Sequence, residues 1–79
     1  MLSIEKDQSA EHIYLHGSAE DLREFAKKLW AIAEKAETKG KHSEQLTTQP
    51  QSDPQLSTTL QGEPKKHRVI KTVNICGRS

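Results

Sequence analysis

The strongest structural signal in the chain is an amphipathic helix between Ala19 and about Thr38. Apolar side chains recur there at steps of three and four residues and form one stripe, while charged residues cover the remaining surface. The stripe consists of Leu22, Phe25, Ala26, Leu29, Ile32, Ala33 and Ala36. Ser18 is placed to cap the first turn, and Gly40 is a typical C-terminal stop. A helix with one apolar stripe needs a second layer against it, so the rest of the chain must supply that layer.

Two short runs before the helix, residues 1–6 and 11–16, alternate between apolar and polar side chains. This period of two is typical of a half-buried β-strand. A polar link at 7–10 separates the runs, so together they predict an antiparallel hairpin. The side chains expected on its buried face are Leu2, Ile4, Ile13 and Leu15. The side chains expected on the opposite, exposed face are His12, Tyr14 and His16.

The segment after the helix is mostly polar. Residues 41–64 are rich in Gln, Ser, Thr and Pro and predict a long polar loop, with room for a short edge strand near Glu44–Thr48. Lys66–Cys76 predicts a closing strand with apolar residues on both faces, and 77–79 should fray. The predicted fold class is α+β: a single domain over 1–79, with one amphipathic helix packed on a small antiparallel sheet in the order β-β-α-(β)-β.

The apolar content is low for a domain that must form its own core. Only 32% of the 79 residues are hydrophobic, and the aromatic residues are Tyr14, Phe25 and Trp30. Small domains often compensate for a thin core with disulfides, metals or oligomerisation. Cys76 is the one cysteine, which excludes an internal disulfide and is typical of a reducing cytoplasm. Because the sequence shows no signal-peptide pattern and no membrane-spanning apolar run, a cytoplasmic homodimer is the expectation.

No group of residues in the sequence indicates catalysis or a bound cofactor. His12 and His16 share a strand face but stand about 13 Å apart, which is too far for one metal ion. Cys76 has no base close in sequence that could activate it as a nucleophile. Glu20 and Asp21 form a carboxylate pair, but their place in the first helical turn explains both. We therefore expect a protein that is not an enzyme and has neither a cofactor nor a metal site.

Charge is uneven along the chain, although the net charge is +1. Residues 1–39 hold six Lys/Arg and eight Asp/Glu, whereas residues 40–79 hold six Lys/Arg and three Asp/Glu. The basic cluster at 65–68 could bind phosphate, but no aromatic residue is interleaved with it to stack on bases. Three interpretations stay open: a solvated strand start, a patch that attracts an acidic protein, or a nucleic-acid-associated accessory protein that uses Lys65, Lys66, Arg68 and Lys71.

The strand before the helix and the helix itself carry a resemblance to a known family. The motif reads Ile13-Tyr14-Leu15-His16-Gly17-Ser18-Ala19-Glu20-Asp21-Leu22-Arg23, then Phe25-Ala26-x-x-Leu29 and Ala33-Glu34-x-Ala36. It is similar to the small immunity proteins of bacterial polymorphic toxin systems, in particular immunity-protein family thirty-two. In that family a segment with histidines and a leucine and a closing strand follow, and here 42–47 and 69–75 occupy those places. The resemblance implies an antitoxin that binds and blocks a toxin domain encoded beside it.

Exposed residues of the hairpin, the helix and the 41–64 segment are expected to contact such a partner. Trp30 lies beside the apolar stripe, where it could either pack on the rim of the core or cover a protein interface. The residues expected to bind the partner are His12, Tyr14, His16, Trp30, His42 and Leu46.

Overall fold

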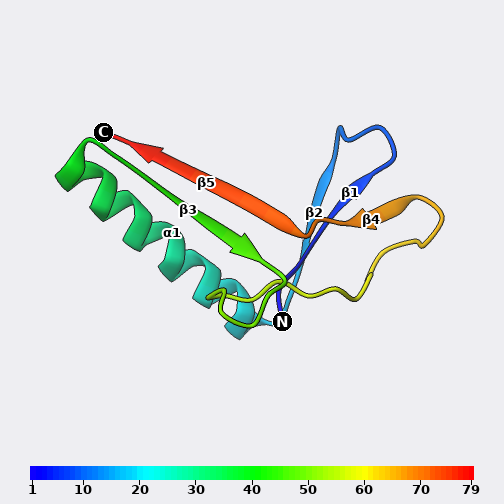
Figure 1. Cartoon of the computed structure of the whole chain (residues 1–79). Coiled ribbons are helices and arrows are strands. Elements are labelled where there is room, and N and C mark those ends of the chain that lie inside the picture. Colours follow the sequence, from blue (N-terminus) through cyan, green and yellow to red (C-terminus); the bar gives the residue numbers. More distant parts are fainter.

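One helix and five strands make up the chain in the computed structural model, which describes all 79 residues. In chain order they are β1 (Ser3–Asp7), β2 (Ile13–His16), α1 (Ala19–Lys39), β3 (Lys41–Thr47), β4 (His67–Val69) and β5 (Thr72–Arg78). The strands form two antiparallel sheets, one in the order β2-β1-β4 and one that pairs β3 with β5 (Figure 1). The predicted α+β class and the predicted hairpin are confirmed, with two small sheets in place of one.

The helix keeps its predicted boundaries because both ends are fixed by local hydrogen bonds. The Ser18 hydroxyl accepts from the backbone N–H of Asp21, and the Asp21 carboxylate accepts from the backbone N–H of Ser18, each at 3.0 Å. This reciprocal pair is a capping box. At the other end, Gly40 has a φ of 87°, and its N–H donates to the Ala36 carbonyl at 2.8 Å. The chain then reverses into β3, so α1 lies along β3 and β5 (Figure 1).

The core lies where the two sheets meet. Its fully buried apolar side chains are Leu2, Ile4, Leu46 and Leu56, and those that pack partly against it are Phe25, Ile70, Val73 and Ile75. Further along the helix, Ile32 and Ala36 are also buried. By contrast, Leu22 and Leu29 keep 43% and 41% of their surface exposed. Because β3 and β5 form a ribbon of only two strands, they leave part of the apolar stripe of α1 uncovered.

The polar segment after the helix begins with a full strand rather than a loop. The predicted loop at 41–64 is wrong at its start, because β3 runs from Lys41 to Thr47 and pairs with β5 along its whole length. The structure thus lengthens the short edge strand predicted near 44–48 and moves it toward the helix. The connection between β3 and β4 spans 48–66, and its one isolated bridge joins Leu56 to Leu2.

The predicted closing strand is two strands that belong to different sheets. It breaks at residues 70–71, so β4 pairs with β1 while β5 pairs with β3. The expectation that the C-terminus frays is also wrong, because Gly77 and Arg78 pair with the first two residues of β3. The N–H of Ser79 adds a hydrogen bond to the Gly40 carbonyl at 3.0 Å. Both differences depend on partners that are distant in sequence.

The two faces of β2 are reversed relative to the prediction. Ile13 and Leu15 are 57% and 47% exposed, whereas Tyr14 and His16 are half-buried. The alternation correctly predicts which side chains share a face, but it does not say which face another segment covers. Here the 48–66 segment lies over the face that carries Tyr14, whereas Ile13 and Leu15 on the opposite face stay exposed.

Strand β1 is buried on both faces, not on one as predicted. Leu2 and Ile4 belong to the apolar core, while Ser3 is 1% exposed and Glu5 has no exposed surface. The Ser3 hydroxyl oxygen lies 3.3 Å from the carbonyl oxygen of Thr59, so the long connection passes over the polar face of the strand.

Candidate functional site

A buried carboxylate joins the hairpin to the long connection. Glu5 Oε2 accepts from the backbone N–H of Gln61 at 2.6 Å and from the Ser3 hydroxyl at 3.2 Å, and Oε1 accepts from the backbone N–H of Gly62 at 3.0 Å. Burial raises the pKa of Glu5, but the hydrogen bonds from Gln61, Gly62 and Ser3 outweigh it, and His16 adds attraction, so the pKa lies below 4.5. Glu5 is therefore held as an ionised anchor.

Two histidines approach the same carboxylate without forming hydrogen bonds to it. His16 Nε2 and His67 Nδ1 both lie 3.6 Å from Glu5 Oε1, and both nitrogens are buried without a hydrogen-bond partner. Tyr14 stacks on His67 with ring centroids 4.5 Å apart. A Cβ on Gly62 would overlap His67 Nδ1, so the cluster has no spare room. No group of three or more His, Cys, Asp or Glu side chains is arranged to hold a metal ion. The geometry is that of a structural cluster that links the hairpin to the long connection.

Two residues predicted to bind a partner lie on different elements, one beside the hairpin turn and one on α1. His12, next to the hairpin turn, places Nδ1 2.8 Å from a carboxylate oxygen of Asp7. Trp30 is 70% exposed on α1, and its Nε1–H donates to Glu34 Oε1 at 2.8 Å. The alternative that Trp30 packs on the rim of the core is therefore wrong, and its role in an interface stays a prediction.

Two further residues predicted to bind a partner, His42 and Leu46, lie on β3 and face the inside of the fold. Leu46 is only 1% exposed, so it belongs to the core and the expectation that it touches a partner is wrong. His42 Nε2 lies 2.8 Å from Glu44 Oε2 and is half-buried. The hydrogen bond from Lys28, followed by that from His42, lowers the pKa of Glu44 to about 2, with Lys35 adding attraction. His42 and Glu44 thus lie on the face of β3 that packs against α1. Alternation along the strand places Leu46 on the same face.

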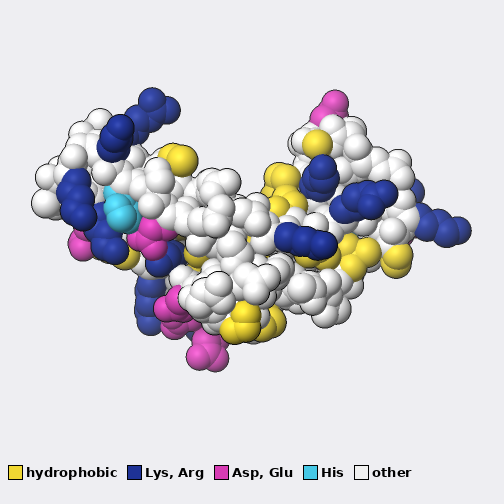
Figure 2. All heavy atoms as spheres, viewed as in Figure 1, with side chains coloured by type: hydrophobic (Ala, Val, Ile, Leu, Met, Phe, Trp, Pro, Cys, Tyr) yellow, Lys and Arg dark blue, Asp and Glu magenta, His cyan; other side chains and the backbone are white.

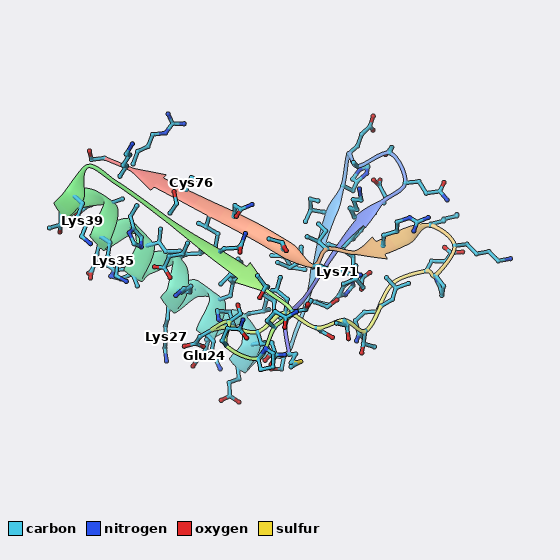
Figure 3. All side chains as sticks on the ribbon, viewed as in Figure 1. Glu24, Lys27, Lys35, Lys39, Lys71 and Cys76 are labelled. Atoms are coloured by element: carbon cyan, nitrogen blue, oxygen red, sulfur yellow. The ribbon has the colours of Figure 1, made fainter.

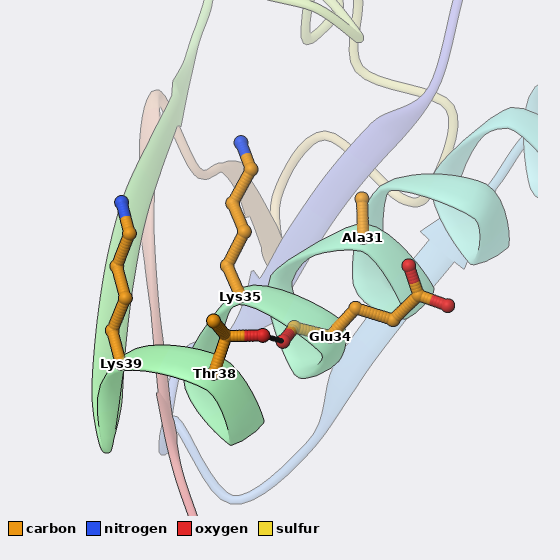
Figure 4. A pocket seen from close by; sticks show the side chains of 5 residues that line it. All are labelled: Ala31, Glu34, Lys35, Thr38 and Lys39. Atoms are coloured by element: carbon orange, nitrogen blue, oxygen red, sulfur yellow. Dashed lines mark hydrogen bonds between the residues drawn. The ribbon is translucent and has the colours of Figure 1, made fainter.

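A shallow hollow on the helix surface does not form a binding site. It is lined by Ala31, Glu34, Lys35, Thr38 and Lys39, all from α1, and opens widely to solvent (Figure 4). The Thr38 hydroxyl donates to the Glu34 carbonyl at 3.1 Å, which is a bond internal to the helix. With a single hydrophobic residue in its wall, this hollow lacks the apolar lining typical of small-molecule sites.

The larger feature is a concave face between the two sheets. The sheets diverge on either side of Lys71, and Figure 2 shows a hollow between the two arms, with hydrophobic side chains on the wall formed by the hairpin. Ile13 and Leu15 are the large hydrophobic side chains of the hairpin that stay exposed, so we assign them to that wall, and β2 is an edge strand. The opposite wall is the outward face of β3 and β5, which carries Cys76 (Figure 3). We define the concave face by these two walls and Lys71.

The sequence contains one pattern that bears on the concave face, but that pattern predicts the wrong exposure. Alternation in residues 11–16 groups Ile13 with Leu15, but two aliphatic side chains on a strand favour burial over exposure. Only the placement of the long connection on the other side of the sheet leaves them open. The anchor at Glu5 gave no signal, because a glutamate in a short alternating strand normally faces solvent.

Comparisons of the chain with protein-family models, with curated proteins and with solved structures found no match. The single helix is not apolar enough over a sufficient length to cross a membrane. The resemblance to immunity proteins therefore remains a prediction that rests on the motif between Ile13 and Ala36.

Proposed function

We propose that this chain is a non-enzymatic protein-binding module of the immunity type, which acts in the cytoplasm and neutralises a cognate toxin domain. The observation that carries the proposal is the exposure of Ile13 and Leu15, at 57% and 47%, on one wall of the concave face. Contiguous exposed apolar side chains, unlike single scattered ones, are a feature of protein association sites. The motif shared with immunity proteins supplies the class of partner.

The position of these residues also suits a protein partner. They lie on β2, whose outer edge is unpaired in the three-stranded sheet, so its backbone N–H and C=O groups are free to extend the sheet. An extended segment that paired with this edge would gain main-chain hydrogen bonds and would place apolar side chains against Ile13 and Leu15. No comparable combination of free strand edge and exposed aliphatic pair exists on the helix side.

Co-expression with the toxin-like domain encoded beside this chain tests the proposal. We expect the wild type to restore growth and to co-purify with that domain, and the double variant Ile13→Ser, Leu15→Ser to lose both properties. The control, Glu37→Ser with Lys39→Ser, removes two exposed side chains from the end of α1 without changing the net charge and should retain both. Equal rescue by the two double variants, or a neighbouring gene without a toxin-like domain, would count against the proposal.

We further propose that two copies associate through α1. The core holds few residues, since 9 of 79 are buried, and Leu22, Leu29 and Trp30 remain exposed on one helix. Covering this strip in a homodimer would add the apolar burial that a small core lacks. Light scattering at micromolar concentration should give twice the chain mass of 8.9 kDa. A mass of one chain would exclude the dimer.

A further inference from the structure

The concave face carries an unusual set of cations. Lys6, Lys41, Arg68, Lys71 and Arg78 are all exposed, and none of them lies within 4.0 Å of a carboxylate. Strand register places Lys6 opposite Arg68 and Lys41 opposite Arg78, so each pair shares one face of its sheet. Like charges that are directly opposite destabilise a sheet slightly, so these two pairs are retained at a small cost to folding.

The two faces match the walls of the hollow. Ile13 is the register partner of Lys6, so Lys6 and Arg68 lie on the wall that carries the exposed aliphatic pair. Arg78 shares the outward face of β5 with Cys76 by alternation. Lys71 stands where the arms meet (Figure 3). Figure 2 shows basic side chains on both arms and at the base of the hollow.

The carboxylates of the same strands are turned away from this face or hydrogen-bonded to neighbouring side chains. Glu5 is buried on the other face of β1, and Asp7 is paired with His12 at 2.8 Å. Glu44 is on the face of β3 toward α1, where Lys28 and Lys35 engage it. The outward face of the β3–β5 ribbon holds no acidic residue, and its members are Lys41, Ser43, Gln45, Thr47, Thr72, Asn74, Cys76 and Arg78. A chain of net charge +1 thus presents one strongly basic surface.

From this segregation we infer that the concave face binds an acidic polypeptide segment, with Ile13 and Leu15 receiving its apolar side chains. The inference rests on the proposed function and names the chemistry of its partner. Lys6 and Arg68 share the wall of the aliphatic pair, and Lys71, Lys41 and Arg78 continue the positive charge along the other arm. These unpaired cations attract carboxylates, while the aliphatic pair contributes the buried contact.

Two other occupants fit this face less well. A nucleic acid would need aromatic side chains to stack on its bases, yet Tyr14 lies on the opposite sheet face, Phe25 packs on the core and Trp30 lies on α1. A second copy bound by two-fold symmetry would set the same basic patch against itself, because such an interface is isologous. The repulsion between like charges disfavours that arrangement.

The test uses the full chain and a fluorescein-labelled peptide of alternating glutamate and leucine, with binding followed by fluorescence anisotropy. We expect the triple variant Lys6→Glu, Lys71→Glu, Arg78→Glu to weaken peptide binding at least about tenfold. The control triple variant Arg23→Glu, Lys27→Glu, Lys65→Glu changes the charge equally on the helix and the long connection and should bind as the wild type does. The comparison requires that circular dichroism spectra of both variants match that of the wild type.

The results that would contradict this inference differ from those that would contradict the proposed function. Equal weakening by both triple variants, undiminished binding of a peptide with glutamine in place of glutamate, or tighter binding of a single-stranded oligonucleotide of equal charge would overturn the inference. If the toxin domain is captured equally by both triple variants, the proposed function stands and the acidic partner fails. If the peptide binds as expected but no toxin is neutralised, the surface stands and the immunity function fails.

Discussion

Replacing Glu5 with alanine should lower the free energy of unfolding by about 3 kcal/mol, because it removes a fully buried side chain and leaves the part-buried N–H groups of Gln61 and Gly62 without their acceptor. The change also removes two of the hydrogen bonds that hold the long connection beside β1, while the bond from the Ser57 N–H to the Leu2 carbonyl remains. For a domain of this size the loss corresponds to a fall in Tm of roughly 15 °C. Chemical denaturation followed by circular dichroism measures the effect. Glu37→Ala, which removes an exposed helical carboxylate, should change stability by less than about 0.5 kcal/mol.

The same anchor has a pH dependence with a definite sign. Although burial alone would raise it, the pKa of Glu5 in the folded chain lies below 4.5, because the hydrogen bonds from Gln61, Gly62 and Ser3 favour the ionised form. The stabilisation is therefore complete above that value and is lost as the pH falls through the lower folded pKa. The stability difference between wild type and Glu5→Gln should be larger at about pH 7 than at about pH 3. An equal difference at both values would show that ionisation of Glu5 does not stabilise the fold.

Features that depend on neighbours in sequence were predicted correctly. The helix start requires only Ser18 and Asp21, and its end requires only Gly40 and the last turn. The local sequence is therefore sufficient to predict both ends of the helix. The hairpin also follows from local alternation and a polar turn. In each case the interacting groups lie within a few residues of one another.

Features that depend on long-range coverage were not predicted. Whether Ile13 or Tyr14 is exposed is decided by the path of residues 48–66, which no local pattern in that polar segment specifies. The break at 70–71 likewise arises because β1 and β3, two different partners, each bind part of the same apolar run. The candidate site could not be predicted for the same reason, because the concave face exists only once both sheets have formed.

Leu46 shows how a residue can be placed in the wrong role. Leu46 is predicted to contact a partner as an exposed residue of the 41–64 segment, but side chains along β3 alternate, and Leu46 falls on the face toward α1. There it is fully buried with Leu2, Ile4 and Leu56. Because the core is small, a fully buried leucine contributes to stability and is not available to a partner.

Leu46→Ala should therefore lower the free energy of unfolding by about 3 kcal/mol, because it removes buried methyl groups and leaves a cavity between the two sheets. Leu29→Ala makes the same chemical change at a site that is 41% exposed and should cost less than about 1 kcal/mol. Urea denaturation of both variants compares the two positions directly. If Leu46→Ala left stability within about 0.5 kcal/mol of the wild type, the junction of the sheets would not be the core of this fold. A large loss at Leu46 beside a small one at Leu29 would instead place the stability of the chain at the base of the concave face, where both walls are anchored.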